Sequence, residues 1–497
     1  MHTRTLALAA ATALAATGLT LPIAATASAA PAAAPATPLA ADFNGDGYDD
    51  LFVGVPSATV GGKAKAGAVS VVFGGEDGPG PHSVRRITQA TVEVPGTPEA
   101  GDRFGGAVVA AHVDDDKYAD LVIGAPGEDL SDSGSAADDD KTDAGSVTVL
   151  YGTGDGFALA NTAARGAKSQ DAYGNALVAA DFTGDTDVDL AIGGKDQIVG
   201  NFNPLAADTK PLMSDRMGGR APVMTTGDFD NDGLDDLALG YYTKNQPYTQ
   251  SHIRLYGWNK DEGSMGNFWN NSNGAANALA AGDFNGDGFD DLALGDCREI
   301  ADENIDDPCG PEELTKGGAI HIRFGDANGS FGWEQQTFNQ DTAGMPGVAE
   351  TGDGFGDALA VADIDADGHD DLIAGAPGEA IGGAAKAGSV TVLKGGEMGL
   401  LDPAGAANAG TVAYQQNSPG ILGVAEAGDL FGAALAFGDH NGDGARDLSV
   451  AAPGENSAAG GVWDLPGAKA GGSVVTPNSI GLPVSLDPPA YGAVLGH

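Results

Sequence analysis

A short acidic stretch recurs along the chain and constrains its fold more than any other feature. The first copy, DFNGDGYDD from Asp42 to Asp50, has Asp or Asn at positions 1, 3, 5 and 9 and Gly47 at position 6. Calcium takes six to eight oxygens at roughly 2.3–2.6 Å, so alternate side chains must offer oxygen while position 6 turns sharply. The spacing therefore predicts a calcium loop in which Tyr48, at position 7, supplies a backbone carbonyl.

Recurrence supports this interpretation, because one such stretch could equally be a turn without a cation. Two further copies are degenerate, and four more are complete, so the seven loops begin at residues 42, 112, 181, 228, 283, 363 and 439. Neighbouring copies begin 47–80 residues apart, which is typical of a repeat architecture. In the degenerate loops, His112 adds no hard oxygen, Lys117 adds a positive charge, and Thr186 replaces Gly. We expect the loop at 112 to bind calcium most weakly.

The predicted calcium ligands are the residues at the odd positions of these loops. They are Asp42, Asn44, Asp46, Tyr48, Asp50, Asp114, Asp116, Asp120, Asp181, Asp185, Asp187, Asp189, Asp228, Asp230, Asp232, Leu234, Asp236, Asp283, Asn285, Asp287, Phe289, Asp291, Asp363, Asp365, Asp367, His369, Asp371, Asp439, Asn441, Asp443, Ala445 and Asp447.

The flanking sequence predicts strands on both sides of each loop. An EF-hand would carry Glu at position 12 between two helices, but the complete copies have Val, Leu or Ala there. Short apolar runs bounded by Gly and Pro surround the loops, and alternating segments such as AGSVTVLYG follow. With 79 Gly and 26 Pro among 497 residues, a helical protein is excluded. We predict an all-β chain.

The charge balance excludes several classes of partner. The chain has 70 acidic and 24 basic residues and a net charge of −46, so it would repel nucleic acid and anionic membrane surfaces. No apolar run after the N-terminus reaches the ~20 residues of a membrane span. We therefore expect no nucleic acid, no membrane span and a soluble monomer.

The N-terminus predicts secretion. Residues 1–29 have a basic start, an apolar stretch and a small-residue cleavage site at Ala27–Ala29, typical of a signal peptide, and residues 30–40 read as a flexible lead-in. Cys297 and Cys309 lie in one acidic insertion. In an oxidising compartment we expect them to form a disulfide, with a free pair or a metal site as the alternatives.

The motifs around the loops carry a family resemblance. Phe104-Gly105 with Gly124-Ala125-Pro126, and Phe355-Gly356 with Gly375-Ala376-Pro377, resemble the FG-GAP repeats of integrin α-subunit N-terminal domains. The resemblance covers about residues 40–497 and implies a seven-bladed β-propeller, of a bacterial-type secreted kind, with calcium in hairpin loops on one face. In the third repeat Tyr173-Gly174 replaces Phe-Gly, and the fourth and fifth repeats lack both motifs. Integrin ligand contacts do not transfer.

No catalytic motif is found in the sequence. It contains no G-x-S-x-G and no H-E-x-x-H, and calcium explains the clustered carboxylates better than general acid–base chemistry does. His252 and His321 lie in alternating segments, where we expect solvent-facing strand residues. The favoured function is a non-enzymatic binding or adhesion module for an extracellular protein or glycan. The alternative is a secreted hydrolase or lyase acting on polysaccharide or lipid.

Aromatic residues gather between the fourth and fifth loops. Flat rings beside amides suit sugars or a protein partner, although they could instead fill these shorter blades. The candidate ligand-binding residues are Tyr241, Tyr242, Tyr248, Trp258 and Trp269.

The two ends of the repeat array complement each other. The loop at Asp42 has no strand before it, while Tyr491-Gly492 near the C-terminus resembles Tyr173-Gly174 but has no loop after it. We predict that the C-terminal strand completes the N-terminal blade, which would leave no open sheet edge. A frayed tail is the alternative.

Overall fold

The computed structural model describes residues 41–80, 83–114, 116–130, 141–206, 209–214, 221–245, 248–271, 276–295, 317–327, 329, 331, 335–482 and 490–496. The expected signal peptide, the lead-in and the pair Cys297 and Cys309 lie outside these residues, so each of them stays a prediction. Helical structure in the described part is confined to α2 (Glu455–Ala458) and the 3-10 turns η1 (Pro204–Ala206) and η2 (Pro466–Ala468). No helix in these ranges has the length and apolar character needed to cross a bilayer.

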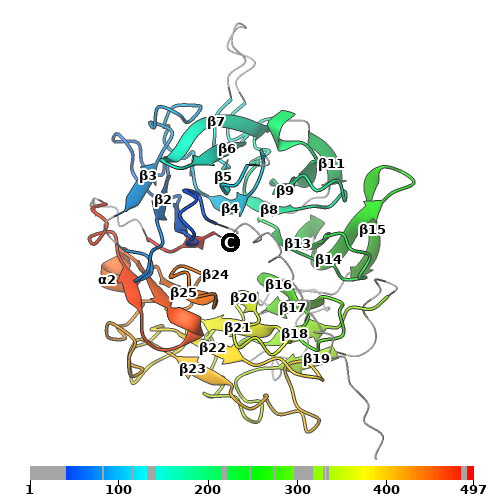
Figure 1. Cartoon of the computed structure of the whole chain (residues 1–497), viewed down its shortest axis with the longest axis vertical. Helices are drawn as coiled ribbons and strands as arrows, with labels where there is room; N and C mark the ends of the chain where they lie inside the picture. Colours follow the sequence, from blue (N-terminus) through cyan, green and yellow to red (C-terminus); the bar gives the residue numbers. More distant parts are fainter. Residues whose placement is uncertain are drawn as a thin grey trace, which may run out of the picture. The chain divides into compact units, whose positions relative to one another are not determined.

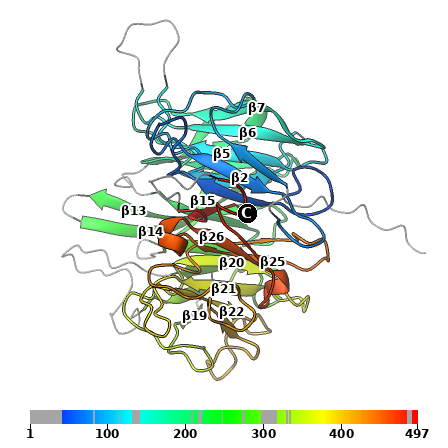
Figure 2. The ribbon, with the colours of Figure 1, turned by 90° about the vertical axis from the view of Figure 1, so that its left-hand side faces the viewer.

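The strands form seven antiparallel sheets of four strands each. The sheets are the blades of a propeller and follow one another in sequence order around a centre, with the first strand of each blade nearest to it (Figure 1). The expected all-β, seven-bladed fold is confirmed. In the view of Figure 2 the long strands β13 (Asp236–Asn245) and β14 (Tyr248–Asn259) extend past the neighbouring sheets.

The first four blades have the following strands, given in their order across each sheet. Blade 3 is given from its outer edge inward and the other three from the inner edge outward. Blade 1 is β28 (Val494–Leu495), β1 (Leu51–Val55), β2 (Ala68–Val72) and β3 (Val84–Ile87). Blade 2 is β4 (Ala107–Ala111), β5 (Asp120–Ala125), β6 (Ser146–Thr153) and β7 (Gly156–Arg165). Blade 3 is β11 (Thr209–Ser214), β10 (Gln197–Asn201), β9 (Asp189–Gly193) and β8 (Ala176–Ala180). Blade 4 is β12 (Val223–Gly227), β13, β14 and β15 (Ser264–Asn271).

The remaining blades follow the same order. Blade 5 is β16 (Ala278–Gly282), β17 (Asp291–Gly295), β18 (Ile320–Arg323) and β19 (Gln335–Phe338). Blade 6 is β20 (Ala358–Ala362), β21 (Asp371–Ala376), β22 (Ser389–Leu393) and β23 (Val412–Tyr414). Blade 7 is β24 (Leu435–Gly438), β25 (Asp447–Ala452), β26 (Gly461–Leu465) and β27 (Ser473–Val475).

The hydrophobic core lies between the blades rather than within them. One cluster joins Val69 and Val71 of β2 to Leu121 and Ile123 of β5, all of them fully buried. The strand after each loop, such as β21, is buried along its whole length because neighbouring blades cover both faces of its sheet. Such strands are continuous apolar runs, which is why the sequence pattern there does not alternate.

The aromatic-Gly motifs join adjacent blades through the backbone. Parallel bridges pair Gly67 with Phe104 and Gly388 with Phe431, which connects the hairpin of one blade to the start of the next. The glycine takes φ of +87° at Gly67, and a Cβ there would lie 2.2 Å from the Phe104 carbonyl oxygen. Only glycine allows this close approach of two backbones.

The C-terminal strand closes the ring, as the sequence predicts. β28 pairs antiparallel with β1, with Leu495 opposite Val53. Tyr491 forms the same parallel bridge, to Gly460, that Phe104 forms to Gly67, and its side chain is 0% exposed. The tail is therefore the first strand of blade 1.

Candidate metal loops and ligand pocket

Six of the acidic loops connect the first strand of a blade to its second strand, and so lie on one face of the ring. The first loop leads into β1, the second strand of blade 1, and is hydrogen-bonded to the seventh loop. The aspartate at position 1 organises its own loop. In the fifth loop, Asp283 Oδ1 accepts the backbone N–H groups of Gly286 (2.7 Å) and Asp287 (3.1 Å), and Oδ2 accepts that of Gly288 (2.8 Å). Asp42, Asp228, Asp363 and Asp439 accept equivalent bonds. The backbone is thus folded around a point toward which carboxylates converge.

The aspartate at position 9 begins the second strand and is buried. Asp50 is 1% exposed and accepts the N–H groups of Gly74 (2.9 Å) and Phe43 (3.0 Å). Burial and, to a smaller extent, the neighbouring carboxylates of Asp42 and Asp46 raise the pKa of Asp50 to about 8. A bound cation would reverse both effects, because it compensates for burial and for repulsion between carboxylates.

Two loops bring three carboxylates within reach of one ion. Oxygen atoms of Asp228, Asp230 and Asp236 in the fourth loop lie within 4.8 Å of one another. The sixth loop brings together Asp363, Asp365 and Asp371 in the same way. These are residues at positions 1, 3 and 9, and their oxygens are the hard donors that calcium requires.

The sixth loop contains a cation that the loop motif does not predict. Lys394, just after β22, places its Nζ 2.9 Å from Asp365 Oδ2 and 2.9 Å from Asp371 Oδ2. Burial lowers the pKa of Lys394 but the two carboxylates outweigh that effect, so the net shift is upward and the ammonium is favoured. A divalent ion at this loop therefore has to displace the lysine side chain.

The third, degenerate loop keeps the backbone of the complete loops. Asp181 accepts the N–H groups of Gly184 (2.7 Å) and Thr186 (3.0 Å), although Thr186 stands where the others have glycine and takes φ of 75°. Asp189 Oδ1 is buried and has no hydrogen-bond partner. In the second loop, the Lys117 ammonium lies 4.4 Å from the centre of the Tyr118 ring.

Position 8 of the loop has a role that the ligand spacing does not predict. The Asp370 N–H donates to the Asp283 carbonyl oxygen (2.9 Å), and the Asp283 N–H donates to Asp370 Oδ2 (2.9 Å), so the fifth and sixth loops are joined. Asp49 and Asp439 join the first and seventh loops by the same pair of bonds, at 3.0 and 2.8 Å. The doubled Asp in the motif was the available signal, since only one of the two is needed as a ligand.

The aromatic cluster lies mainly inside blade 4. Tyr241 and Tyr242 are 2% and 8% exposed, so their rings offer no face to a ligand. Trp258 and Trp269 are half-buried, and Trp269 packs edge-on against Phe331. The side chain of Tyr248 lies outside the described part of the chain. Consecutive side chains on β13 and β14 point to opposite faces of the sheet. Both faces meet neighbouring blades, so consecutive residues can both be buried.

The two strand histidines are half-buried rather than fully exposed to solvent. The Nε2 of His252 lies 3.0 Å from Thr243 Oγ1, and its ring stacks on Tyr241. The Nδ1 of His321 lies 2.9 Å from Thr337 Oγ1, and burial lowers its pKa.

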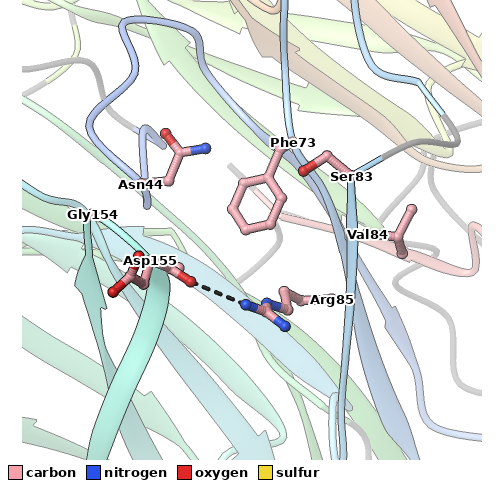
Figure 3. Close-up of a pocket in the computed structure, with 8 residues that line it drawn as sticks. Asn44, Phe73, Ser83, Val84, Arg85, Gly154 and Asp155 are labelled. Carbon is pink, nitrogen blue, oxygen red and sulfur yellow. Dashed lines mark hydrogen bonds between the residues drawn. The ribbon is translucent and has the colours of Figure 1, made fainter.

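A cavity of about 370 Å³ opens between blades 1 and 2, beside the first loop (Figure 3). Asn44 of that loop, the Phe73 ring and the Arg85 guanidinium face it. Arg85 donates one hydrogen bond to the Asp155 carbonyl oxygen, 3.1 Å away, and is exposed. The cavity therefore combines a positive group, a flat ring and polar atoms, which the sequence alone did not bring together.

Comparisons with known proteins agree with this architecture. The FG-GAP repeat description matches residues 34–72, 355–393 and 431–463, and an FG-GAP-like repeat description matches residues 218–294. The chain is thus a seven-bladed β-propeller that carries FG-GAP repeats.

Its curated relatives come from two kinds of protein. Phosphatidylinositol-glycan-specific phospholipase D of Bos taurus is 33% identical over 157 residues, which are 31% of this chain and 18% of the relative. The Rattus norvegicus protein of that name is 33% identical over 189 residues, covering 35% and 21%. Integrin alpha pat-2 of Caenorhabditis briggsae is 29% identical over 240 residues, covering 46% and 17%. The matches thus span about a fifth of each relative.

Among solved structures, the exotype rhamnogalacturonan lyase YesX aligns with 13% identity over 65% of this chain and 58% of that one. The TM-score is 0.31, which is too low to carry an argument.

Proposed function

We propose that the chain is a calcium-loaded propeller that binds an extracellular protein or glycan. The observation that carries the calcium proposal is the convergence of Asp228, Asp230 and Asp236 within 4.8 Å, in a loop whose backbone is already folded by hydrogen bonds to its first aspartate. Calcium would be held there by side-chain oxygens at positions 1, 3, 5 and 9 and by the carbonyl of Leu234. Calcium supplies positive charge that offsets the buried carboxylates.

Removal of calcium tests this proposal. A loop that binds with a dissociation constant tenfold below the free calcium concentration contributes about RT ln 11, or ~1.4 kcal/mol. Five such loops would contribute ~7 kcal/mol, comparable with the ~5–15 kcal/mol stability of a typical domain. We expect excess EDTA to lower the melting temperature by well over ten degrees and excess calcium, but not magnesium, to restore it. An unchanged melt in EDTA would refute the proposal.

The cavity beside the first loop supports the binding role. In a chain of net charge −46, the Arg85 guanidinium offers a positive group beside the polar side chain of Asn44. A carboxylate-bearing glycan fits this chemistry best. Because Asn44 belongs to both the cavity and the first loop, binding of such a glycan would depend on calcium.

A pair of neighbouring arginines provides a matched test of the binding role. Arg85 lines the cavity, whereas Arg86 is equally exposed on β3 but does not line it. On an array of uronic- and sialic-acid oligosaccharides, we expect Arg85→Ala to weaken binding by about tenfold or more, because the variant loses one charge-assisted hydrogen bond to the ligand. Arg86→Ala should bind as the wild type does. Equal binding by the two variants would place the ligand elsewhere.

A second candidate function is a hydrolase or lyase, which the phospholipase D relatives favour. The matches cover only about a fifth of those relatives, so they do not determine whether this chain shares the relatives' activity. We expect no turnover of ester, glycoside, polyuronate or glycosylphosphatidylinositol substrates by the purified protein. Activity that survives repurification and is lost in a single point variant would establish the enzyme instead.

A further inference from the structure

Blade 7 carries buried polar side chains where other blades carry apolar ones. His440 is position 2 of the seventh loop, a place occupied by fully buried phenylalanines in four other loops: Phe43, Phe182, Phe229 and Phe284. Ser449 of β25 lies opposite Asp464 of β26, whereas the equivalent pair in blade 1 is Phe52 opposite Val71. Three polar replacements at neighbouring buried positions in one blade indicate a local function beyond packing.

These side chains converge in the blade interior. His440 Nδ1 lies 2.8 Å from Asp464 Oδ1, and ligand atoms of His440, Asp447 and Asp464 all lie within 4.8 Å of one another. The three residues are only 3%, 0% and 1% exposed. Asp447 and Ser449 are two residues apart on β25, so both side chains face the same side of the sheet as Asp464.

Two buried oxygens in this group have no hydrogen-bond partner. Asp447 Oδ1 accepts the Gly467 N–H at 3.0 Å, but Oδ2 accepts no bond. Ser449 Oγ is also without a hydrogen-bond partner, at 0% exposure. Leaving such buried oxygens without a hydrogen-bond partner is unfavourable, so the arrangement calls for a further ligand.

The neighbouring calcium loop explains only part of this arrangement. A calcium ion held by the seventh loop could contact Asp447, but it gives no reason for an imidazole and a second carboxylate at buried, otherwise apolar positions. A Ser-His-Asp hydrolytic site is not supported either, because Ser449 is inaccessible to a substrate and makes no hydrogen bond to His440.

We propose that His440, Asp447 and Asp464 form a separate site for a transition-metal cation of the zinc type. Imidazole nitrogen together with carboxylate oxygen suits zinc, cobalt or nickel, whereas calcium prefers oxygen alone. The Ser449 hydroxyl or a water molecule would complete four-fold coordination. Asp447 would then be shared with the calcium loop, and the ion would enter as the blade folds, since the site is closed to solvent.

The site lies where the last blade meets the first. The Gly75 N–H of blade 1 donates to the His440 carbonyl oxygen at 3.0 Å, and a Cβ on Gly78 would lie 2.9 Å from Asp464 Oδ2. A metal ion held here would therefore stabilise the contact between the last blade and the first. Asp439 and Asp49, which form a hydrogen bond nearby, are 390 residues apart in the chain.

The test is to refold metal-stripped protein in saturating calcium with increasing amounts of Co²⁺, because the closed site fills as the blade folds. We expect one equivalent of Co²⁺ to produce the visible absorption of tetrahedral coordination, and Zn²⁺ added before refolding to prevent that absorption. His440→Phe combined with Asp464→Val restores residues that blade 1 contains at these places, so the variant should fold. It should lose at least 100-fold in cobalt affinity while keeping its calcium affinity within a few-fold.

Two further variants keep the test decisive. If the double variant fails to fold, Asp464→Asn provides the comparison. This substitution keeps the shape of the side chain and should weaken cobalt binding. His321→Ala removes a half-buried strand histidine of blade 5 and should leave the cobalt spectrum unchanged. Absence of cobalt binding by calcium-saturated wild type would overturn the proposal, and so would equal binding by wild type and the folded double variant.

Discussion

The closing strand of the propeller offers a sharp test of how the ring is held together. The perturbation is Tyr491→Ala, since this side chain is fully buried between the last blade and the first. Its ring packs with Val462, its hydroxyl lies 3.5 Å from Ser70 Oγ, and its backbone N–H donates to the Ala459 carbonyl oxygen. The truncation leaves the backbone bond but removes the whole aromatic side chain.

The expected loss follows from burial. Replacing a fully buried aromatic residue by alanine typically costs about 3–5 kcal/mol, and the hydroxyl adds little at its 3.5 Å distance from Ser70. Deleting residues 490–496 also removes Leu495, 8% exposed, and the strand pair with β1. The deletion should therefore cost more, approaching the ~5–15 kcal/mol stability of a typical domain.

Urea unfolding in saturating calcium measures both changes. Tyr491→Phe should unfold within about 1 kcal/mol of wild type, since it keeps the ring and loses only one weak hydrogen bond. Tyr173→Ala provides a second comparison, because it removes the equivalent residue at a junction that is continuous in the chain. If Tyr491→Ala or the deletion unfolds at the wild-type urea concentration, the tail does not hold the ring.

Three further outcomes follow from particular side chains. Burial raises the pKa of Glu128 from 4.5 to about 7, so the folded protein holds this proton more tightly than the unfolded chain does. The free energy of unfolding should therefore fall by ~1–3 kcal/mol, allowing for partial exposure, as pH rises from about 4.5 to 8. Urea melts of Glu128→Gln should lose that part of the pH dependence, whereas those of the exposed-site variant Glu93→Gln should keep it. Gly378→Ala should destabilise strongly, since its Cβ would lie 1.8 Å from a backbone oxygen, whereas Gly266→Ala has open space and should cost about 1 kcal/mol or less; equal melting temperatures would contradict this. Lys394→Met should strengthen calcium binding at the sixth loop several-fold in a terbium-competition titration, and an unchanged affinity would show that the ammonium does not compete.

The repeat spacing predicted seven similar units, and the resemblance of the flanking motifs to FG-GAP repeats implied that these units are propeller blades. Seven copies of a loop flanked by short apolar runs specify seven similar units, and the orphan pattern at Tyr491-Gly492 identifies which strand completes the first of them. These features are local in sequence, so their structural meaning can be deduced without knowing which blades touch. The alternation of apolar and polar residues was a weaker signal for individual strands, because the second strand of a blade, such as β21, is buried on both faces.

Contacts between segments that are distant in sequence could not be deduced in this way. Lys394 lies 23 residues from Asp371, and nothing in the loop motif predicts that its ammonium reaches the carboxylates. Tyr241 and Tyr242 cluster in sequence with half-buried aromatics, yet both are buried, and Tyr241 packs in a cluster with residues of blade 3. His440 looks like a variable loop residue until the strand register places Asp464 beside it. Each of these depends on the packing of one blade or loop against another segment.

The closing strand also changes what counts as the beginning of this protein. Residues 51–55 and 494–495 are neighbouring strands of one sheet, although they lie at opposite ends of the described chain. A circular permutant that joins residue 496 to residue 41 through a short linker, and opens between β23 and β24, would make that sheet continuous and move the non-covalent closure to the boundary between blades 6 and 7. The same seven units would then assemble from a different starting point, so the order of synthesis could be varied independently of the final ring.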